Sequence, residues 1–417
     1  MERLAKLPAD QQNVVIFDAA MRLLKSNYHD YELFEKPEWS AYEAGWRKKA
    51  SESQSGGWLY ANVLSNLGTS FPDSRLYFVS PARPPPTVAT SAPREAQSPA
   101  DPAILARTQQ IAALSSSGPG FDIVPIRRGH RTLNLVGDVV RGSPAERAGI
   151  SPGWKVGDWG YVSNLRGVHF KATFIALAPA EARDLERTGL PLNTESQQEL
   201  DEFVAAHKTE LKFDNELLAA RTNFETRTFA NGVTYLRFDH FNEWSNISRI
   251  LDVIDAAGPA GLVIDLRRNT GGRTFYMRRV IGRLLGGGVT LGTLRANGST
   301  EPLRSWKIGS GHYEGPLVLL IGPLSTSAAE LTAAAVQDHK RGKLVGRMTN
   351  GSVVTGQMYD LPDGGKMMIP TRDFVRLDSR RIEGSGVEPD IWILPTLEDV
   401  RAGRDPVLER ALEKLKK

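Results

Sequence analysis

Hydrophobic residues recur along this chain with two different spacings, which divide it into regions. Between residues 11 and 68 the apolar side chains follow the three-to-four-residue spacing of helices, as Phe17, Met21 and Leu24 do. From residue 232 to 346, short continuous apolar runs alternate with helical patterns. This alternation predicts a mostly parallel sheet wrapped by helices, because parallel strands are buried on both faces and need helical crossovers.

The individual elements follow from the same pattern. In the N-terminal part, helices are predicted from about residue 11, at 39–46 and at 59–67, and a short strand within 71–81. Farther on, strands are predicted at 232–238, 261–267 and 315–321, and helices at 197–211, 247–257, 274–285, 331–338 and 406–417. The aromatic residues of the first helices are interpreted as core.

Proline and glycine mark the boundaries of four predicted regions. Residues 81–105 are rich in proline, which favours a spacer over a ligand for a proline-binding partner. We therefore expect the following organisation: a helical part at 1–80, a proline-rich linker at 81–112, a small β domain at 113–190 and an α/β core at 191–417.

The small β domain begins at a glycine-rich loop made of Gly118, Pro119, Gly120 and Phe121. Strands are predicted at 122–126 and 132–140. The segment 142–150, Gly-Ser-Pro-Ala-Glu-Arg-Ala-Gly-Ile, then predicts a one-turn helix with serine as N-cap and proline at the first position. By themselves, these glycines could simply serve turns.

Composition narrows the classes of protein that this chain can be. It has 417 residues, 41% of them apolar and 24% charged, which is enough for two or three globular domains. Its 52 basic and 48 acidic residues leave a charge of +4 without a dense basic block, so nucleic acid is not expected as a partner. The chain has no cysteine and no evident metal-spaced set of ligands, so neither a metal nor another cofactor is predicted.

The candidate chemistry centres on Ser327, between the apolar run at 315–321 and an alanine-rich helical stretch. A serine at a strand-to-helix turn is exposed at the sheet edge, and the first N–H groups of the helix point towards whatever it attacks. The same letters, Ser-Ala-Ala-Glu330, also fit a capping box in which the serine is N-cap and the glutamate reaches back. The stretch alone leaves capping and catalysis open.

A second glycine-rich turn follows the strand at 261–267 and reads Arg-Asn-Thr-Gly271-Gly272. Adjacent glycines let the backbone come close to a substrate and direct N–H groups at a developing oxyanion. The alternative is a plain connection in which Asn269 supports a tight turn.

Four motifs in the same order resemble peptidase family S41, which includes the C-terminal processing peptidases and the tricorn-like core. They are the 261–272 turn, Ser327–Glu330, Gln337-Asp338 and Ile-Glu-Gly-Ser-Gly-Val-Glu-Pro-Asp at 382–390. The 113–190 region resembles a bacterial PDZ domain, from the G-x-G-F loop and the G-S-P-A-x-x-A-G-I segment. The resemblance implies a crotonase/ClpP-like catalytic sheet with an inserted, mainly β PDZ domain.

The resemblance also implies roles for individual residues. Ser327 matches the nucleophile, and the N–H of Ala328 with that of Gly271 or Gly272 matches the oxyanion hole. Gly118, Pro119, Gly120 and Phe121 match the loop that binds a peptide C-terminal carboxylate, with the peptide adding as a strand. The resemblance therefore predicts a serine endopeptidase that acts on peptides or unfolded proteins and recognises their C-termini.

The general base departs from both patterns of the family. One branch uses a lysine in T-x-G-K-G, and Ser352 stands at that position. The other uses a Ser-His pair and a late glutamate; Ser74 and Glu383 match, but Arg75 stands where the histidine belongs. Arginine stays charged and has no lone pair, so it cannot accept the serine proton. Arg75 could instead pair with Glu383 or with a peptide carboxylate.

This departure keeps a second function open, a catalytically impaired relative that acts as a peptide-binding scaffold. A third, a binder of apolar small molecules, exists in the wider family. Of the seven histidines, only His240 and His339 lie near the core motifs, and either is a fallback candidate for the base. The resemblance predicts that Ser327, Ser74 and Glu383 share one cleft.

The N-terminal sequence and the length of the apolar runs indicate the cellular compartment that is expected for the protein. The first ten residues carry charges without a following apolar region, and no run reaches the ~20 apolar residues of a spanning helix. A cytoplasmic protein without a transmembrane segment is expected as written, and a periplasmic or secreted one if the N-terminus was trimmed. The sequence leaves the oligomeric state open.

Overall fold

The chain divides into two compact units, each built from segments distant in sequence. The computed structural model describes residues 4–53, 55–71, 73, 75–81, 120–128, 131–164, 167–189, 202, 205, 208–214, 223–307, 309 and 311–416. Unit 1 combines Met1–Ala92, Thr290–Arg304 and Ser352–Gly384. Unit 2 combines Pro93–Val289, Ser305–Gly351 and Ser385–Lys417. The predicted linker at 81–112 lies almost wholly outside the described residues, and the four predicted regions remain a prediction.

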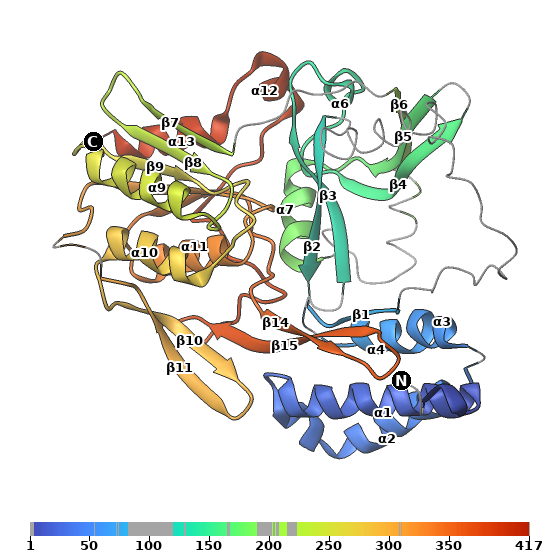
Figure 1. Cartoon of the computed structure of the whole chain (residues 1–417). Helices are drawn as coiled ribbons and strands as arrows, with labels where there is room; N and C mark the ends of the chain where they lie inside the picture. The colour runs from blue at the N-terminus through green and yellow to red at the C-terminus, as the bar shows by residue number, and fades with distance from the viewer. Residues whose placement is uncertain are drawn as a thin grey trace, which may run out of the picture. The chain divides into compact units, whose positions relative to one another are not determined.

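The N-terminal helices of unit 1 form where the apolar spacing predicts them (Figure 1). They are α1 (Ala9–Asn27), α2 (Pro37–Ser51), α3 (Gly56–Trp58), a π-helical turn η3 (Leu59–Leu64) and α4 (Ser65–Thr69), with short 3-10 turns η1 (Leu4–Lys6) and η2 (Tyr31–Glu35). Phe17 and Leu24 are fully buried, and each such side chain contributes about 1.5–3 kcal/mol when removed from water.

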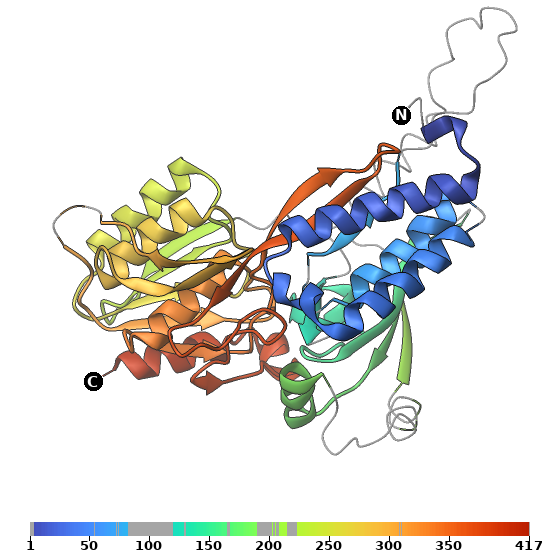
Figure 2. The same ribbon diagram turned by 90° about the horizontal axis from the view of Figure 1, so that it is seen from below.

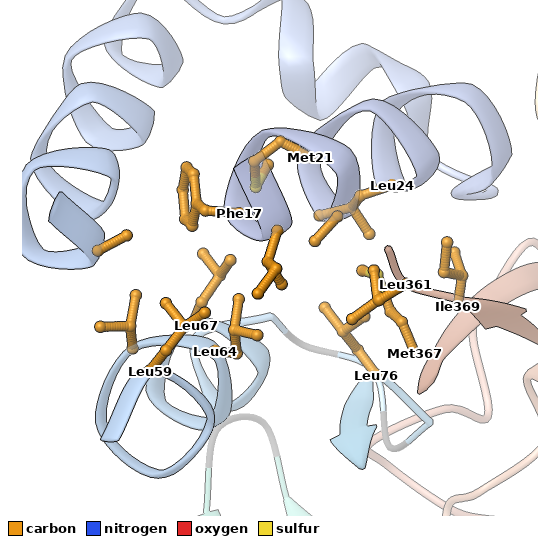
Figure 3. Close-up of a cluster of buried hydrophobic side chains, with 14 of the residues drawn as sticks. Phe17, Met21, Leu24, Leu59, Leu64, Leu67, Leu76, Leu361, Met367 and Ile369 are labelled. Carbon is orange, nitrogen blue, oxygen red and sulfur yellow. The ribbon is translucent and has the colours of Figure 1, made fainter. Parts of the chain in front are cut away.

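Unit 1 also contains an antiparallel sheet that the sequence pattern did not predict, apart from β1. Its strands are β1 (Tyr77–Val79), β10 (Thr290–Ala296), β11 (Ser299–Arg304), β14 (Thr355–Asp360) and β15 (Lys366–Val375). The order is β1-β15-β10-β11, and β14 pairs with β15. Figure 3 shows Leu361, Met367 and Ile369 from this sheet region in one cluster with Phe17 and Leu24. The helices and the sheet therefore share one core.

The central sheet of unit 2 is mostly parallel, as predicted. Its order is β16-β13-β12-β9-β8-β7, and only the β7–β8 pair is antiparallel. The strands are β7 (Phe224–Thr228), β8 (Thr234–Phe238), β9 (Leu262–Asp265), β12 (Leu317–Ile321), β13 (Lys343–Gly346) and β16 (Ile391–Trp392). Every residue of β9 and β12 is buried, which explains their continuous apolar runs.

Helices cover both faces of this sheet. They are α9 (Trp244–Ala256), α10 (Thr274–Leu285), α11 (Ala328–Asp338) and α13 (Pro406–Leu415), whereas α12 (Leu397–Ala402) packs its Val400 against a cluster around Phe121 and Phe174. Figure 2 shows the yellow helices α9 and α10 on one side and the red helix α13, near the C-terminus, on the other. Val407 and Leu408 of α13 pack in one cluster with Val318 and Leu320 of β12. The layered α/β arrangement therefore agrees with the alternating pattern.

A second sheet of unit 2 is antiparallel, in the order β2-β3-β4-β5-β6. Its strands and helices are β2 (Phe121–Arg128), β3 (Arg131–Val139), β4 (Lys155–Asn164), β5 (Gly167–Ile175), β6 (Lys208–Asp214), α6 (Pro144–Arg147) and α7 (Pro179–Thr188). The hydroxyl of Ser143 accepts from the N–H of Glu146, so the predicted one-turn helix and its N-cap are confirmed. The helix predicted at 197–211 is wrong at its end, because Lys208 begins a strand paired with Ile175.

Candidate active site

Ser327 lies on a turn between a buried strand and a helix, as the sequence predicts. Strand β12 ends at Ile321 and helix α11 begins at Ala328. Ser327 is the N-cap residue, with φ 58° and ψ −117°. An N-cap residue ordinarily has β-region dihedrals, and a positive φ costs a non-glycine residue about 1–3 kcal/mol. A strained serine at a strand-to-helix turn is the arrangement of a nucleophile elbow.

The turn is held by the end of the neighbouring parallel strand β9. The Ser325 hydroxyl donates to the Leu266 carbonyl at 2.7 Å and accepts from the Gly322 N–H at 3.0 Å. The Thr326 N–H donates to the Asn269 carbonyl at 3.0 Å. Since the two residues before it are tied down, the backbone at position 327 has little freedom to relax the strain.

The buried carboxylate of Glu330 holds the Ser327 turn through hydrogen bonds. Its side chain is fully buried, and Oε2 accepts from the Ser327 N–H at 2.9 Å. Oε1 accepts from the Thr349 hydroxyl and the Gly351 N–H, each at 2.6 Å. The glutamate of the predicted capping box therefore reaches back as expected, and it also ties the serine turn to the 349–351 segment. Capping and catalysis do not exclude each other here.

The 349–351 segment is also held from the antiparallel sheet of unit 2. Arg128, the last residue of β2, donates to the carbonyls of Asn350 at 2.9 Å and Thr349 at 3.1 Å. Burial lowers the pKa of Arg128 to about 10, although the charges of Glu186 and Glu330 oppose the shift. The second sheet is thereby anchored to the segment that Glu330 binds.

Gly271 and Gly272 bring a backbone segment directly against Ser327. Their φ values are 91° and 134°, which favour glycine. A Cβ on Gly271 would lie 2.7 Å from the Ser327 Cβ and 3.1 Å from the Ala328 nitrogen. The Gly271 N–H already donates to Asn269 Oδ1 at 2.9 Å, whereas Gly272 is exposed. This favours the N–H of Gly272 as the donor towards a substrate.

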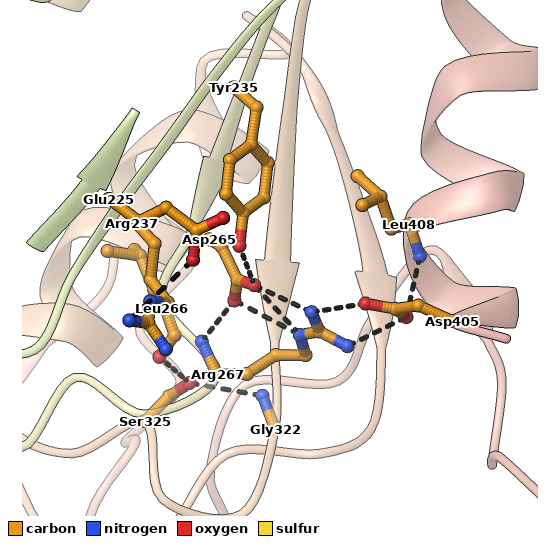
Figure 4. A network of polar contacts seen from close by, with 10 residues as sticks. All are labelled: Glu225, Tyr235, Arg237, Asp265, Leu266, Arg267, Gly322, Ser325, Asp405 and Leu408. Carbon is orange, nitrogen blue, oxygen red and sulfur yellow. Dashed lines mark hydrogen bonds and ion pairs between the residues drawn. The ribbon is translucent and has the colours of Figure 1, made fainter. Parts of the chain in front are cut away.

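An ion-pair network fixes the strand end from which the glycine turn starts (Figure 4). Arg267 pairs with Asp265 at 2.6 Å and with Asp405 at 2.7 Å, and the Tyr235 hydroxyl donates to Asp265 at 2.9 Å. Burial alone raises the pKa of Asp265, but the Arg267 charge and the hydrogen bonds outweigh it and hold that pKa below its usual range. The Asp-Leu-Arg part of the motif is therefore structural.

Three other predicted catalytic residues, Ser74, Arg75 and Glu383, fall in segments of unit 1. Ser74 lies outside the described residues. Glu383 is 6% exposed and accepts from the N–H groups of Val353 at 2.7 Å and Val354 at 3.0 Å. Among the residues that the structure describes, no ion pair joins Arg75 to Glu383. Ser327 belongs to unit 2, so a cleft shared by Ser327, Ser74 and Glu383 remains a prediction.

A buried polar network that no local sequence pattern indicated is centred on Asp73. Asp73 is fully buried and accepts from the Tyr28 hydroxyl, contacts His29 Nε2 at 2.8 Å and pairs with Arg381 at 2.9 Å. Arg381 also pairs with Asp373 at 2.6 Å. Burial alone raises the pKa of Asp73, but hydrogen bonds from His29 and Tyr28 and the Arg381 charge hold it below its usual range. The network joins Asp73 to Arg381, two residues before Glu383.

The structure separates the two fallback histidines. His339 is exposed at the C-terminal end of α11, so it lies on the order of 16 Å from Ser327 along an 11-residue helix. That distance excludes His339 as the base. His240 precedes Phe241, whose N–H donates to the Gly271 carbonyl at 2.7 Å. The His240 Nδ1 is buried without a hydrogen-bond partner, which keeps His240 a candidate.

Half of the predicted carboxylate-binding loop is described. Gly118 and Pro119 lie outside the described residues. Gly120 has φ 95°, and a Cβ there would lie 2.1 Å from the Ser143 Cβ, so a larger residue cannot be placed there. Phe121 is 7% exposed and packs edge-on against Phe174, with ring centroids 5.5 Å apart. The Phe121 side chain is therefore core, and any carboxylate binding would fall to the backbone.

Among the described residues, no three histidine, aspartate or glutamate side chains are grouped so that they could hold a metal ion. Nor, within those same residues, is any helix both long and apolar enough to cross a membrane.

Comparison with protein families matches residues 232–393 to the model of peptidase family S41. This chain is 24% identical over 254 residues to the carboxyl-terminal-processing protease of Synechocystis sp., covering 60% of this chain and 56% of that protein. It is 29% identical over 183 residues to the carboxy-terminal-processing protease of Bartonella bacilliformis, covering 42% of each. The chain thus spans about half the length of these curated relatives.

Solved structures agree on the fold. The photosystem II D1 C-terminal processing protease superposes with a TM-score of 0.60 at 18% identity and covers 97% of both chains. Mature CPAF in complex with lactacystin superposes with a TM-score of 0.55 at 12% identity and covers 98% of both chains. The likeness therefore extends over nearly the whole chain.

Proposed function

The chain belongs to peptidase family S41, and from this premise we propose that it is a serine endopeptidase acting on peptides or unfolded proteins. One observation carries the proposal: Ser327 has a strained positive φ on a strand-to-helix turn and packs directly against Gly271. A helix cap alone does not require that conformation, because caps ordinarily take β-region dihedrals.

The proposed chemistry is acyl transfer. The Ser327 hydroxyl oxygen bonds to the carbonyl carbon while its proton passes to a base, and the N–H groups of Ala328 and Gly272 stabilise the oxyanion. The C–N bond then breaks and the proton leaves with the amine. Water releases the acyl group by the same steps. Ser74 and Glu383 are proposed to support the base position, as the family pattern implies.

A fluorophosphonate probe tests this proposal directly, because it reacts only with an activated serine. Mass spectrometry of the labelled protein should find the adduct on Ser327 and on no other serine. An unlabelled protein, under conditions in which a known serine peptidase is fully labelled, would contradict the proposed function.

Arg75 and Ser352 favour a second candidate function, an impaired relative that binds peptides without turning them over efficiently. Both stand where the family branches place a base, and neither residue type can replace it: arginine has no lone pair, and an unassisted hydroxyl is too weakly basic. Loss of a base typically leaves about 10³–10⁴-fold catalysis over water.

Restoring an imidazole distinguishes these candidates. We expect Arg75→His to raise turnover of an unstructured substrate at least tenfold, about 1.4 kcal/mol off the barrier, because neutral histidine can accept a proton near pH 7. Initial rates on a fluorogenic peptide measure the effect, and Arg75→Gln is the matched control without a base. If Arg75→His slows an already fast peptidase, the base lies elsewhere and His240→Asn is the next variant to measure.

We further propose that the β2–β6 sheet and α7 form a PDZ-like module that recognises peptide C-termini. Support comes from the glycine that the loop requires at position 120 and from the capped α6 turn that follows. A peptide with a free apolar C-terminus should therefore bind more tightly than its amidated twin, measured by fluorescence anisotropy. Equal affinities would remove the PDZ role.

The proposed partners are peptide or protein substrates, in keeping with the processing proteases among the relatives. The cytoplasmic location expected from the N-terminus gains no support from the comparisons. One relative, from Arabidopsis thaliana, is named as a chloroplastic peptidase. The crotonase/ClpP-like classification of the central sheet is likewise proposed here from its parallel order and the family match.

A further inference from the structure

Three large aromatic side chains are exposed together on unit 2. Trp244 opens α9, Phe275 is in the first turn of α10, and Trp306 follows β11; they are 50%, 43% and 37% exposed. The Phe275 and Trp306 ring centroids lie 4.7 Å apart at 74°. We refer to Trp244, Phe275 and Trp306 as the aromatic cluster. Contiguous exposed apolar surface commonly marks a binding site.

Arg279 contacts all three rings of the aromatic cluster, and Arg278 lies 5.3 Å from the Trp306 ring centroid alone. The Arg279 guanidinium lies 4.8 Å from the Trp244 ring centroid, 4.9 Å from Phe275 and 5.3 Å from Trp306. Its Nε is buried without a hydrogen-bond acceptor. Among the described residues no carboxylate forms an ion pair with Arg279, so the ring faces are its main electrostatic partners.

The backbone contacts of Trp306 do not account for its exposed ring. The Trp306 N–H donates to the Arg278 carbonyl at 2.9 Å. The Trp306 carbonyl approaches Gly282 so closely that a Cβ there would lie 1.9 Å away. These contacts fasten the main chain to α10 and do not require an aromatic side chain.

Two members of the aromatic cluster lie within a few residues of segments that form the candidate oxyanion loop. Phe275 follows Gly272 by three residues, and Trp244 follows Asn242 by two. A Cβ on Gly272 would lie 2.6 Å from Asn242 Oδ1, and one on Gly271 would lie 2.7 Å from the Ser327 Cβ. A peptide whose carbonyl reaches the Gly272 N–H would therefore have a neighbouring side chain within reach of these rings.

We propose that the aromatic cluster is a substrate subsite that takes an aromatic side chain close to the scissile bond; this rests on the proposed peptidase function. Ring edges and faces suit aromatic pairing, and exposed tryptophans lose little conformational freedom on binding. Arg279 already occupies the position that a substrate cation would take among the three rings. The subsite should therefore accept phenylalanine and reject lysine.

Binding to a Ser327→Ala variant tests the subsite without requiring turnover. The probes are four alanine-glycine peptides, acetylated and amidated so that no free carboxylate engages the PDZ-like module, with Phe, Ala, Lys or Asp at one central position. We expect the Phe peptide to bind at least tenfold more tightly than the Ala peptide, and the Lys peptide no more tightly than Ala. With 5-fluorotryptophan in the protein, the Trp244 and Trp306 signals in ¹⁹F NMR should shift with the Phe peptide.

Substitutions within the aromatic cluster then test whether the preference for the Phe peptide depends on these side chains. Trp244→Ala and Phe275→Ala should each reduce the preference for Phe at least fivefold, whereas Trp58→Ala, which removes a similarly exposed tryptophan from α3, should leave it unchanged. Arg279→Gln should improve Lys binding. An unchanged preference for Phe in the cluster variants, or tightest binding of the Asp peptide, would overturn the proposal.

The labelling experiment separates this outcome from the proposed function. If Ser327 is not labelled but the Phe preference depends on the cluster, the subsite is supported and the peptidase activity is not. If Ser327 is labelled and no peptide preference depends on the cluster, the peptidase activity is supported and the subsite is not.

Discussion

Replacing Ser327 with alanine is expected to remove fluorophosphonate labelling and to lower peptide hydrolysis by at least about 10³-fold. Loss of the nucleophile alone costs about 10⁶-fold in subtilisin, and because nucleophile and base act as a unit, a large loss here also requires that Ser327 has a working base. Initial rates on an unstructured fluorogenic peptide, with each protein at equal concentration, measure the loss.

The fold should survive this change. The Ser327 N–H keeps its bond to Glu330, and alanine carries about the same cost as serine at φ 58°. Ser299→Ala, which alters an exposed serine in β11, is the matched control and should keep full activity. Hydrolysis by Ser327→Ala at the wild-type rate would show that another residue is the nucleophile.

Arg267→Met is expected to lower the free energy of unfolding of unit 2 by about 3–5 kcal/mol. Asp265 is 2% exposed, and without Arg267 its charge stays buried with only the Tyr235 hydroxyl and a backbone N–H nearby. Denaturant unfolding followed by tryptophan fluorescence measures the change. Arg380→Met breaks an exposed pair with Asp378 and should cost no more than about 1 kcal/mol.

The pH dependence provides an independent check on the Asp265 network. Because the folded protein holds the pKa of Asp265 below its usual range, the stabilisation is present above the unfolded pKa of about 3.9 and is lost as the pH falls through the lower folded value. The difference between wild type and Arg267→Met should therefore shrink as the pH falls below about 4. A difference that is constant with pH would show that Arg267 stabilises by packing alone.

Local patterns predicted most helices and the parallel strands of unit 2 well. Helix α10 spans 274–285 as expected, and the runs at 261–267 and 315–321 became β9 and β12. These elements carry their own signal, since helix faces and doubly buried strands impose a spacing on the sequence. The strands β10, β11, β14 and β15 were missed. They form two local hairpins, β10–β11 and β14–β15, and the two hairpins join only through the pairing of β10 with β15, which lies far away in the chain.

The strand β6 shows how packing overrides a local preference. Residues 208–211 were expected to end a helix, yet Lys208 and the residues after it pair along β5. Strand propensity depends on the neighbouring strand more than on the residues themselves. The helix prediction could not include that neighbour.

The candidate site divides in the same way. The Ser327 turn and the nearby glycine turn were predicted from the sequence, because a strand-to-helix turn and positive φ values restrict which residues can occupy such positions. The buried contacts could not be predicted. Glu330 binds Gly351, 21 positions away, and Asp73 binds His29 and Arg381, 44 and 308 positions away. Such residues come into contact only in the folded protein, so no local sequence pattern predicts their contacts. The conformation of each turn, in contrast, depends on the residues within it and can be predicted from them.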